Sequence, residues 1–126
     1  MFLVRPQNRS KIELDASKNR NRLVCKICKT LISQQSYLIA VDGKTPYYTF
    51  YNPSHYRFDI MTLSNCYSVL DVSPFSFDYT WFAGYAWSVL CCSSCYEHLG
   101  WRFRNQEKNP PLFFALIQNK LEDRPP

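Results

Sequence analysis

Residues 80–103 read TWFAGYAWSVLCCSSCYEHLGWRF and carry most of the information about how this chain folds. Two cysteines with two residues between them, Cys92 and Cys95, lie near the middle, and apolar residues flank them on both sides. A cysteine pair on a tight turn between two apolar runs is typical of an antiparallel hairpin with a metal-binding turn. We therefore expect residues 80–103 to fold back on themselves at the cysteines.

The hairpin predicts which side chains lie opposite each other. With the turn at the cysteine pair, residues whose numbers add to about 188 face one another, so Trp87 meets Trp101. Tyr85 then lies near Phe103. Because side chains alternate between the two faces of a strand, Trp101 and Phe103 share one face, and the turn places several large rings on one surface.

The third tryptophan of the chain, Trp81, precedes a predicted turn at 82–84 and can fold back beside Trp87. Three indoles then form a small concave box. Such a box holds a quaternary ammonium by cation–π attraction, or a flat neutral ring by stacking and apolar burial. A hydrophobic core that happens to be rich in tryptophan explains the same residues equally well.

A second cysteine pair, Cys25 and Cys28, lies 67 residues before the first. Two such turns supply the tetrahedral sulfur shell that zinc prefers, which predicts a closed, structural site that joins distant parts of the chain. Disulfides, a thioredoxin-like redox pair and iron in place of zinc are the alternatives. Cys66 and Cys91 remain, and we interpret them as buried small hydrophobes.

The composition indicates one β-rich domain. The chain has 126 residues, 46% of them hydrophobic and 17% aromatic, and its 3 glycines are too far apart for a nucleotide-binding glycine loop. We expect a partly ordered lead-in over residues 1–22, a ligand-binding domain over 23–122 and a tail over 123–126. Runs rich in Tyr, Phe, Val and Thr predict strands at Ser36–Val41, Tyr47–Tyr51 and Asp59–Leu63.

Two segments have helical character by spacing, Lys29–Gln35 and Leu112–Leu121. The apolar run at the start of the second also suits a buried strand, and periodicity leaves that choice open. Turn signals occur at 42–44 and 52–53.

The formal net charge is +5, and basic residues are concentrated between Arg5 and Lys29. Asn and Ser interrupt this segment, so we favour a solvated tail or a strand edge over a nucleic-acid site. No apolar run reaches the length of a membrane span, and Arg5 ends the N-terminal run Met1–Val4. We therefore expect a cytoplasmic protein without membrane contact.

Residues 80–103 closely resemble the thalidomide-binding, or CULT, domain of the cereblon family, and the single-domain bacterial members in particular. The Cys25–Cys28 pair, the turn at Asn52 and Pro53, and Leu112–Ile117 extend the resemblance from Leu23 over nearly the whole remaining chain. It implies a β-tent fold, in which one zinc pins two antiparallel sheets that meet at an angle, with a strand near the C-terminus. It also implies an aromatic cage for a cyclic imide, such as the glutarimide of thalidomide-type drugs, or for a uracil-like ring as in uridine.

Carried over by position, the resemblance assigns the cage walls to Trp81, Trp87 and Trp101, and the cage floor to Phe103. It assigns the zinc ligands to Cys25, Cys28, Cys92 and Cys95. It assigns the loop beside the ligand to Asn52, Pro53 and Phe58. Tyr79 matches a position that contributes its backbone carbonyl, and the rim residues Ser54, Tyr79 and Thr80 depart from the family pattern.

The expected function is therefore ligand binding without catalysis. The expected partners are a cyclic imide, a uridine-like ligand or a cyclic imide at a protein C-terminus, and we expect no ubiquitin-ligase adaptor region in these 126 residues. A reader of methyl-lysine or another quaternary ammonium is the alternative that uses the same tryptophans. An enzyme related to methionine sulfoxide reductases would instead need a reactive thiol, for which Cys66 and Cys91 are the candidates.

Overall fold

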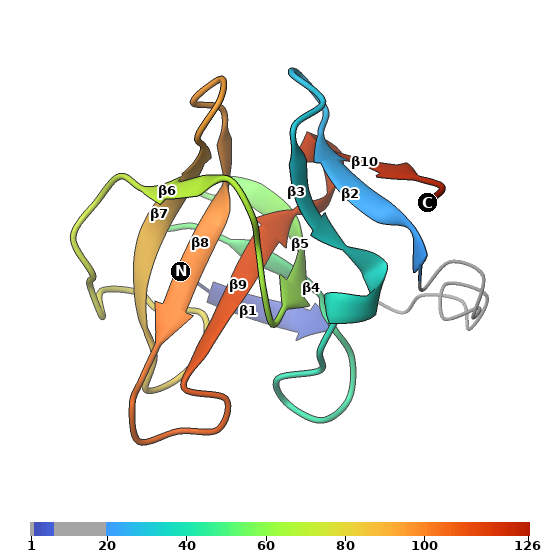
Figure 1. The fold of residues 1–126 in the computed structure, drawn as a ribbon. Helices are drawn as coiled ribbons and strands as arrows, with labels where there is room; N and C mark the ends of the chain where they lie inside the picture. The colour runs from blue at the N-terminus through green and yellow to red at the C-terminus, as the bar shows by residue number, and fades with distance from the viewer. Residues whose placement is uncertain (1, 7–19) are drawn as a thin grey trace.

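Two antiparallel sheets of unequal size form the fold in a computed structural model that describes residues 2–6 and 20–126 (Figure 1). The large sheet has the strand order β1 (Phe2–Pro6), β4 (Tyr47–Tyr51), β5 (Arg57–Leu63), β9 (Leu112–Ile117), β8 (His98–Arg104), β7 (Ala86–Cys92) and β6 (Val69–Asp71). The small sheet has the order β10 (Leu121–Arg124), β2 (Arg22–Cys25) and β3 (Leu31–Gln34). This confirms the predicted β class with two antiparallel sheets.

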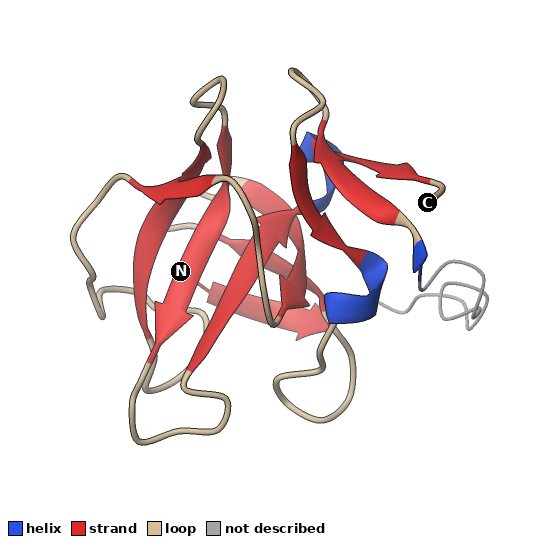
Figure 2. Cartoon of the chain, in the orientation of Figure 1, coloured by secondary structure: helices blue, strands red, loops and turns tan. Residues whose placement is uncertain are grey.

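Helical structure in the described residues is confined to short turns, which Figure 2 shows between the strands. Two of these 3-10 turns are η3 (Gln35–Tyr37) and η4 (Gln118–Lys120). The second connects β9 in the large sheet directly to β10 in the small one. Within the described part of the chain, no helix has the length and apolar character that crossing a membrane requires.

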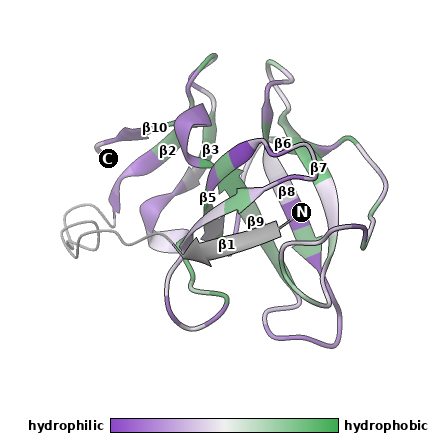
Figure 3. Cartoon of the chain, turned by 180° about the vertical axis from the view of Figure 1, so that it is seen from behind, coloured by the Kyte–Doolittle hydropathy of each residue, from purple (hydrophilic) through white to green (hydrophobic). Residues whose placement is uncertain are grey.

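Strand β9 settles the choice that periodicity left open. Residues 113–117 are all buried, and β9 pairs with β5 on one side and β8 on the other. A central strand that is covered on both faces reads as a continuous apolar run rather than an alternating one. Figure 3 shows the hydrophobic colour along this strand.

Two local predictions were wrong. Lys29–Gln35 is not helical, because Leu31–Gln34 forms β3 and pairs with β2, a contact that spacing within the segment does not reveal. Ser36–Val41 is not a strand, because η3 begins at Gln35 and a turn follows. The strands predicted at 47–51 and 59–63 are confirmed as β4 and part of β5.

The element boundaries also refine the predicted domain. Strand β10 continues to Arg124, two residues beyond the predicted end at 122, because it pairs with β2 up to Arg22. Strand β1 brings residues 2–6 of the predicted lead-in into the large sheet beside β4. Residues 7–19, most of the predicted lead-in, lie outside the described residues, and with them Arg9, Lys11 and Lys18 of the basic stretch.

The β7–β8 hairpin forms as predicted, but its register differs. Trp87 lies opposite Phe103 rather than Trp101, and Val89 lies opposite Trp101. The turn is longer than assumed, since the Cys92 N–H bonds to the Glu97 carbonyl at 2.9 Å, and a bulge follows Leu90. A change of two positions leaves each side chain on its predicted face, so Trp87, Trp101 and Phe103 still share a surface.

Two clusters of buried side chains form the core. One lies around the cysteines and includes Cys25, Leu63, Leu90 and Leu99. The other is aromatic and contains Phe50, Trp81, Phe82, Trp101, Phe103 and Phe113. Strands β5, β8 and β9 contribute to both clusters, so the same strands support the two candidate sites.

Candidate metal centre and ligand site

The two cysteine turns have the same backbone geometry, displaced by 67 residues. In the first, the Lys29 N–H donates to the Cys25 carbonyl at 2.8 Å, and in the second the Tyr96 N–H donates to the Cys92 carbonyl at 2.8 Å. Lys29 and Tyr96 both adopt left-handed backbone conformations, with φ of 67° and 64°. Each turn therefore presents its two thiols from one side of a tight loop.

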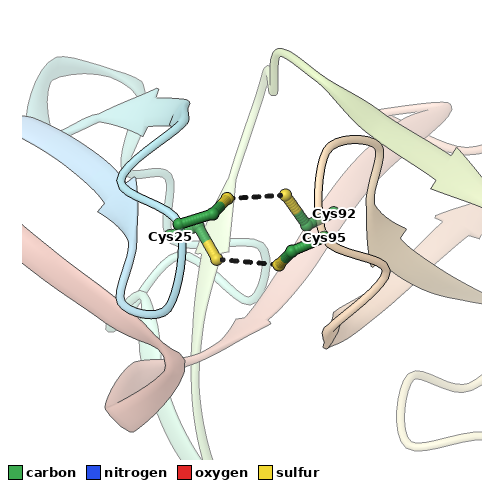
Figure 4. A group of neighbouring side chains, drawn as sticks. Cys25, Cys92 and Cys95 are labelled. Atoms are coloured by element: carbon green, nitrogen blue, oxygen red, sulfur yellow. Dashed lines mark hydrogen bonds between the residues drawn. The ribbon is translucent and has the colours of Figure 1, made fainter.

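The two turns face each other across the gap between the sheets (Figure 4). The Cys25 and Cys95 sulfurs are 3.6 Å apart, as are the Cys28 and Cys92 sulfurs, and all four sulfurs lie within 4.8 Å of one another. Zn–S bonds of ~2.3 Å in a tetrahedron place sulfurs about 3.8 Å apart. The spacing fits four ligands of one metal ion and is far too long for a disulfide.

Two of the four thiols have pKa values that are shifted, in opposite directions. Hydrogen bonds with the side chain and backbone of Thr30 lower the pKa of Cys28 to about 6. The Glu97 backbone acts to lower the pKa of Cys95, but burial and the neighbouring thiols raise it to about 12. Four thiolates at this distance repel one another, and a bound divalent cation removes that repulsion. The residues therefore fit a metal ion with four sulfur ligands.

A metal here would join the two sheets. Cys25 ends β2 of the small sheet, whereas Cys92 ends β7 of the large sheet. The Lys26 N–H bonds to the Lys120 carbonyl at 3.0 Å, and the Lys120 ammonium lies 3.5 Å from a Glu97 carboxylate oxygen, so η4 contacts both turns. With four protein ligands the shell has no open position, which indicates a structural role.

Two of the predicted cage residues are in direct contact. The rings of Trp81 and Trp101 have centroids 4.6 Å apart at 74°, an edge-to-face arrangement, and the residues are only 4% and 3% exposed. Phe58 on β5 packs against both, with centroids 5.8 Å from Trp81 and 5.1 Å from Trp101. The structure thus brings these three rings together as one aromatic wall.

Trp87 packs at the edge of the same cluster and is half-buried. Its indole N–H donates to the Asp78 carbonyl at 2.8 Å, and its backbone exchanges two hydrogen bonds with Ser76. These bonds fix the ring against the loop at 76–80. Trp87 is the tryptophan of the three that retains substantial solvent exposure.

Phe103 is fully buried and belongs to the core beneath the tryptophans. Its ring stacks on Phe113 with centroids 5.2 Å apart at 9°, and meets Phe82 edge-to-face at 5.0 Å. It shares a strand face with Trp101 two residues earlier. Its ring contacts are with core rings, and its role as a cage floor stays a prediction.

The Asn52 side chain organises its own loop. Its Oδ1 atom accepts hydrogen bonds from the Ser54 N–H at 3.0 Å and the Tyr56 N–H at 2.9 Å. His55 adopts a left-handed conformation within this turn, and Pro53 is exposed beside it. The turn carries the chain from β4 into β5, where Phe58 joins the cluster. Asn52 and Pro53 therefore set the path of the loop, and Phe58 makes the ring contacts.

The loop between Tyr79 and Trp81 presents backbone groups beside the rings. Tyr79 is left-handed, with φ of 54°, and the Thr80 N–H bonds back to the Phe77 carbonyl at 3.3 Å. Among the described residues, neither the Tyr79 carbonyl nor the Trp81 backbone N–H has a hydrogen-bond partner. One acceptor and one donor thus lie two residues apart next to the aromatic wall.

Two residues in the cluster were not predicted from the sequence as parts of the site. Phe50 on β4 stacks on Trp81 with centroids 4.6 Å apart at 6°, and His98 meets Trp101 edge-to-face at 4.9 Å. Burial lowers the pKa of His98, and its Nε2 atom lies 3.1 Å from the Gly100 carbonyl oxygen. The aromatic run at 47–51 indicated a buried strand, but its ring contact depends on the long loop that carries Trp81.

The remaining cysteines do not have the properties of reactive thiols. Burial raises the pKa of Cys66 to about 12 and also raises the pKa of Cys91. A nucleophilic thiol requires the opposite shift, toward the thiolate at neutral pH. Neither pKa shift therefore favours a nucleophilic thiol, and both side chains are half-buried rather than fully buried as predicted.

Comparison with known proteins finds similarity in sequence and in fold. Protein cereblon from Gallus gallus is 31% identical over 122 residues, which cover 94% of this chain and 27% of that protein. The cereblon proteins of Danio rerio and Xenopus tropicalis are each 29% identical and cover 90% and 94% of this chain. The chain spans about a quarter of the length of these relatives, at 27% of each. No protein-family model matches it.

Among solved structures, the crystal structure of the Mis18 "Yippee-like" domain aligns with a TM-score of 0.53. The alignment covers 82% of this chain and 93% of that one at 16% sequence identity. At this identity the likeness concerns the fold alone.

Proposed function

The chain is a domain of the cereblon family, and we propose that it is a small-molecule binding module that holds a cyclic imide or a uracil-like ring among Trp81, Trp87 and Trp101. Its ligands would be free imides, uridine-like molecules or a cyclic imide at a protein C-terminus. Cyclic imides and uracil share a planar ring edge on which an N–H lies between two carbonyl groups. Binding such an edge requires a fixed acceptor and a fixed donor beside apolar walls.

The observation that carries the proposal is the pair of backbone groups without partners beside the aromatic wall. The Tyr79 carbonyl would accept the imide N–H, and the Trp81 N–H would donate to an imide carbonyl. Because indoles exclude water from these bonds, an unmade bond there costs more than one at the surface. Substituting the imide nitrogen with a methyl group would remove the donor and add a clash.

The contact between Trp81 and Trp101 indicates how a ring would enter. At a centroid distance of 4.6 Å the two indoles touch, so a guest ring must separate them. Trp101 is fixed on β8, whereas Trp81 lies on the long loop between β6 and β7. The indole N–H of Trp81 donates to the Tyr51 carbonyl at 3.3 Å, beyond the usual length of a strong bond. Trp81 is therefore the wall that we expect to move.

We propose zinc as the metal held by the four cysteines. Four thiolates in a tetrahedral shell favour zinc, and a closed shell would supply rigidity rather than chemistry. Since β7 and β8 carry both a metal turn and the rings of Trp87 and Trp101, the ion would fix the hairpin on which the binding site is built. The proposal therefore includes no catalytic step.

Titrating the zinc-loaded protein with glutarimide while recording tryptophan fluorescence tests the binding function. We expect saturable quenching with glutarimide and none with N-methylglutarimide. The Trp87→Ala variant should lose the response with its zinc content unchanged, whereas Leu70→Ala, an exposed position on β6, should behave like the parent protein. An unchanged signal at millimolar glutarimide in the zinc-loaded protein contradicts the proposal. Displacement of glutarimide by an equal concentration of tetramethylammonium would instead indicate a cation reader.

A further inference from the structure

The face of β7, β8 and β9 opposite the rings carries, at its exposed Arg104 end, a feature that the ring site does not use. Side chains alternate along β8, so Trp101 and Phe103 point to the core while Arg102 and Arg104 point to the opposite face. From this face we propose a second binding site, centred on Arg104, for a carboxylate carried by an extended peptide segment.

Arg104 is held in place without its charge being neutralised. Its guanidinium lies over the ring of Phe75, with 3.6 Å between the guanidinium carbon and the ring centroid. In the part of the chain that the structure describes, Arg104 forms no ion pair with a carboxylate. Stacking orders the planar group and leaves its N–H edges available, and those edges match a carboxylate in a two-pronged arrangement.

The neighbouring arginine shows the contrast. Arg102 donates from Nε to an Asp71 carboxylate oxygen at 2.9 Å and stacks on Phe114 at 4.7 Å. The same Asp71 oxygen accepts the Ser88 hydroxyl at 2.6 Å. Arg102 is therefore already paired and half-buried, so Arg104 is the cation of the two that has an open hydrogen-bonding edge.

Two cavities flank Arg104 across the strands. Ala86 on β7 and Leu112 on β9 are its two cross-strand partners. On the Ala86 side a cavity of about 520 Å³ extends past Phe77 and Gly84, and on the Leu112 side one of about 390 Å³ extends toward Pro111. Phe75, Arg104 and Gln106 line both cavities.

The shape and lining favour an extended peptide over a lone anion. The two cavities lie on either side of a single cation, so a chain that crosses the strands can place one carboxylate on Arg104 and one apolar side chain in each cavity. Apolar groups line both sides, with Phe77 65% exposed and Leu112 38% exposed. The other charged groups that line the two cavities are Asp71, Arg102 and Glu107. With Asp71 paired to Arg102, Glu107 would disfavour a second acidic residue on the Ala86 side.

The test uses the zinc-loaded full chain, labelled with ¹⁵N, and the peptide acetyl-Leu-Gly-Glu-Gly-Leu-amide, in which the glutamate and both leucines lie on one face of an extended chain. We expect saturable shifts of the amide signals of Ala86, Arg104 and Leu112. The peptide with glutamine in place of glutamate should bind about tenfold more weakly, because it loses a charge-assisted hydrogen bond. The Arg104→Gln variant should weaken binding by a similar factor and remove the preference for glutamate. Arg124→Gln, on the small sheet, is the matched control and should bind like the parent.

Phe75→Ala provides an independent variant, since it removes the stacking surface and leaves the charge. We expect it to weaken glutamate binding several-fold and to retain the preference over glutamine. Equal binding of the two peptides, shifts confined to other surfaces, or full affinity in Arg104→Gln would each overturn the proposal. Tighter binding of inorganic phosphate or a single-stranded oligothymidine at the same amides would overturn the peptide assignment. None of these results depends on the imide site, which lies on the opposite face of the hairpin.

Discussion

The three tryptophans differ in their surroundings, and this determines which of them reports on binding. Trp101 is 3% exposed and contacts rings on three sides, whereas Trp87 is half-buried and tied to the Asp78 carbonyl. Removing a fully buried aromatic side chain leaves a cavity that neighbouring groups fill only in part. The same substitution at Trp87 removes fewer contacts.

We therefore expect Trp101→Ala to lower the free energy of unfolding by about 3–5 kcal/mol, and Trp87→Ala by about half as much. Urea unfolding followed by circular dichroism measures both, with zinc content determined in each variant. Equal losses at the two positions would contradict the burial difference. Loss of ligand binding in Trp101→Ala alone would not separate a damaged cage from a damaged core, which makes Trp87 the better test of function.

The sequence was more informative about the four metal-binding cysteines than about the contacts of the aromatic residues. The Cys-X-X-Cys spacing is local chemistry, so Cys25, Cys28, Cys92 and Cys95 could be grouped before any fold was known. Phe50 and His98 were not predicted as parts of the site. Their contacts with Trp81 and Trp101 join strands and loops that are far apart in the sequence, so sequence spacing does not reveal them. The Arg104–Phe75 stack was missed for the same reason.

Strand β8 has no room for a side chain at Gly100. A Cβ atom added to Gly100 would overlap the carbonyl oxygen of Ala115 on β9. Gly100 faces Leu116 in that strand and Leu90 in β7, directly beside the bulge of the hairpin. Only a residue without a side chain permits this approach, so Gly100 fixes the spacing of the strands that carry the site.

We expect Gly100→Ala to destabilise the protein by about 3 kcal/mol or more, because backbone on β9 would have to move. Gly43→Ala is the control, since its Cβ meets nothing within 4 Å and its φ of +80° makes the cost purely conformational. That cost is about 1 kcal/mol. Thermal unfolding of both variants measures the difference, and similar midpoints would show that β8 and β9 can separate freely.

Predictions of secondary structure failed where pairing between strands determined the structure and the hydrophobic spacing within the segment did not. The segment 29–35 has helical spacing, but Leu31–Gln34 pairs with the edge of β2 and forms strand β3. The hairpin register was misplaced because the turn extends to Glu97 and a bulge follows Leu90, neither of which the apolar alternation reveals. The predicted face of the hairpin for each aromatic side chain was still correct, because a register shift of two residues leaves every side chain on the same face.

The metal centre is one of several connections between the two sheets. Turn η4 and the four cysteines, two on the turn of each sheet, join them at one end, and Leu23 and Ile32 of the small sheet also pack with large-sheet residues in one buried cluster. Binding of a structural metal stabilises the folded state because the unfolded chain has no assembled site. We infer that the metal centre and the buried cluster around it together hold the relative position of the sheets.

Removing a single ligand tests this dependence. Cys28→Ser should abolish stoichiometric zinc binding and lower the thermal midpoint by more than about 10 °C, with loss of the environment of Trp101 seen as a red shift in fluorescence. Cys91→Ser is the matched control, because Cys91 adjoins a ligand without being one of the four. Zinc retention and an unchanged midpoint in Cys28→Ser would contradict the assignment, as would an equal loss in Cys91→Ser.

The touching rings of Trp81 and Trp101 also bear on how fast a ligand can bind. If every guest must wait for the same two indoles to part, then the observed association rate will rise with ligand concentration only until ring separation becomes limiting. Different guests would share that ceiling and differ in how long they remain. Such a pocket distinguishes its ligands by their dissociation rates, because the separation of the two indoles limits the association rate of every ligand in the same way.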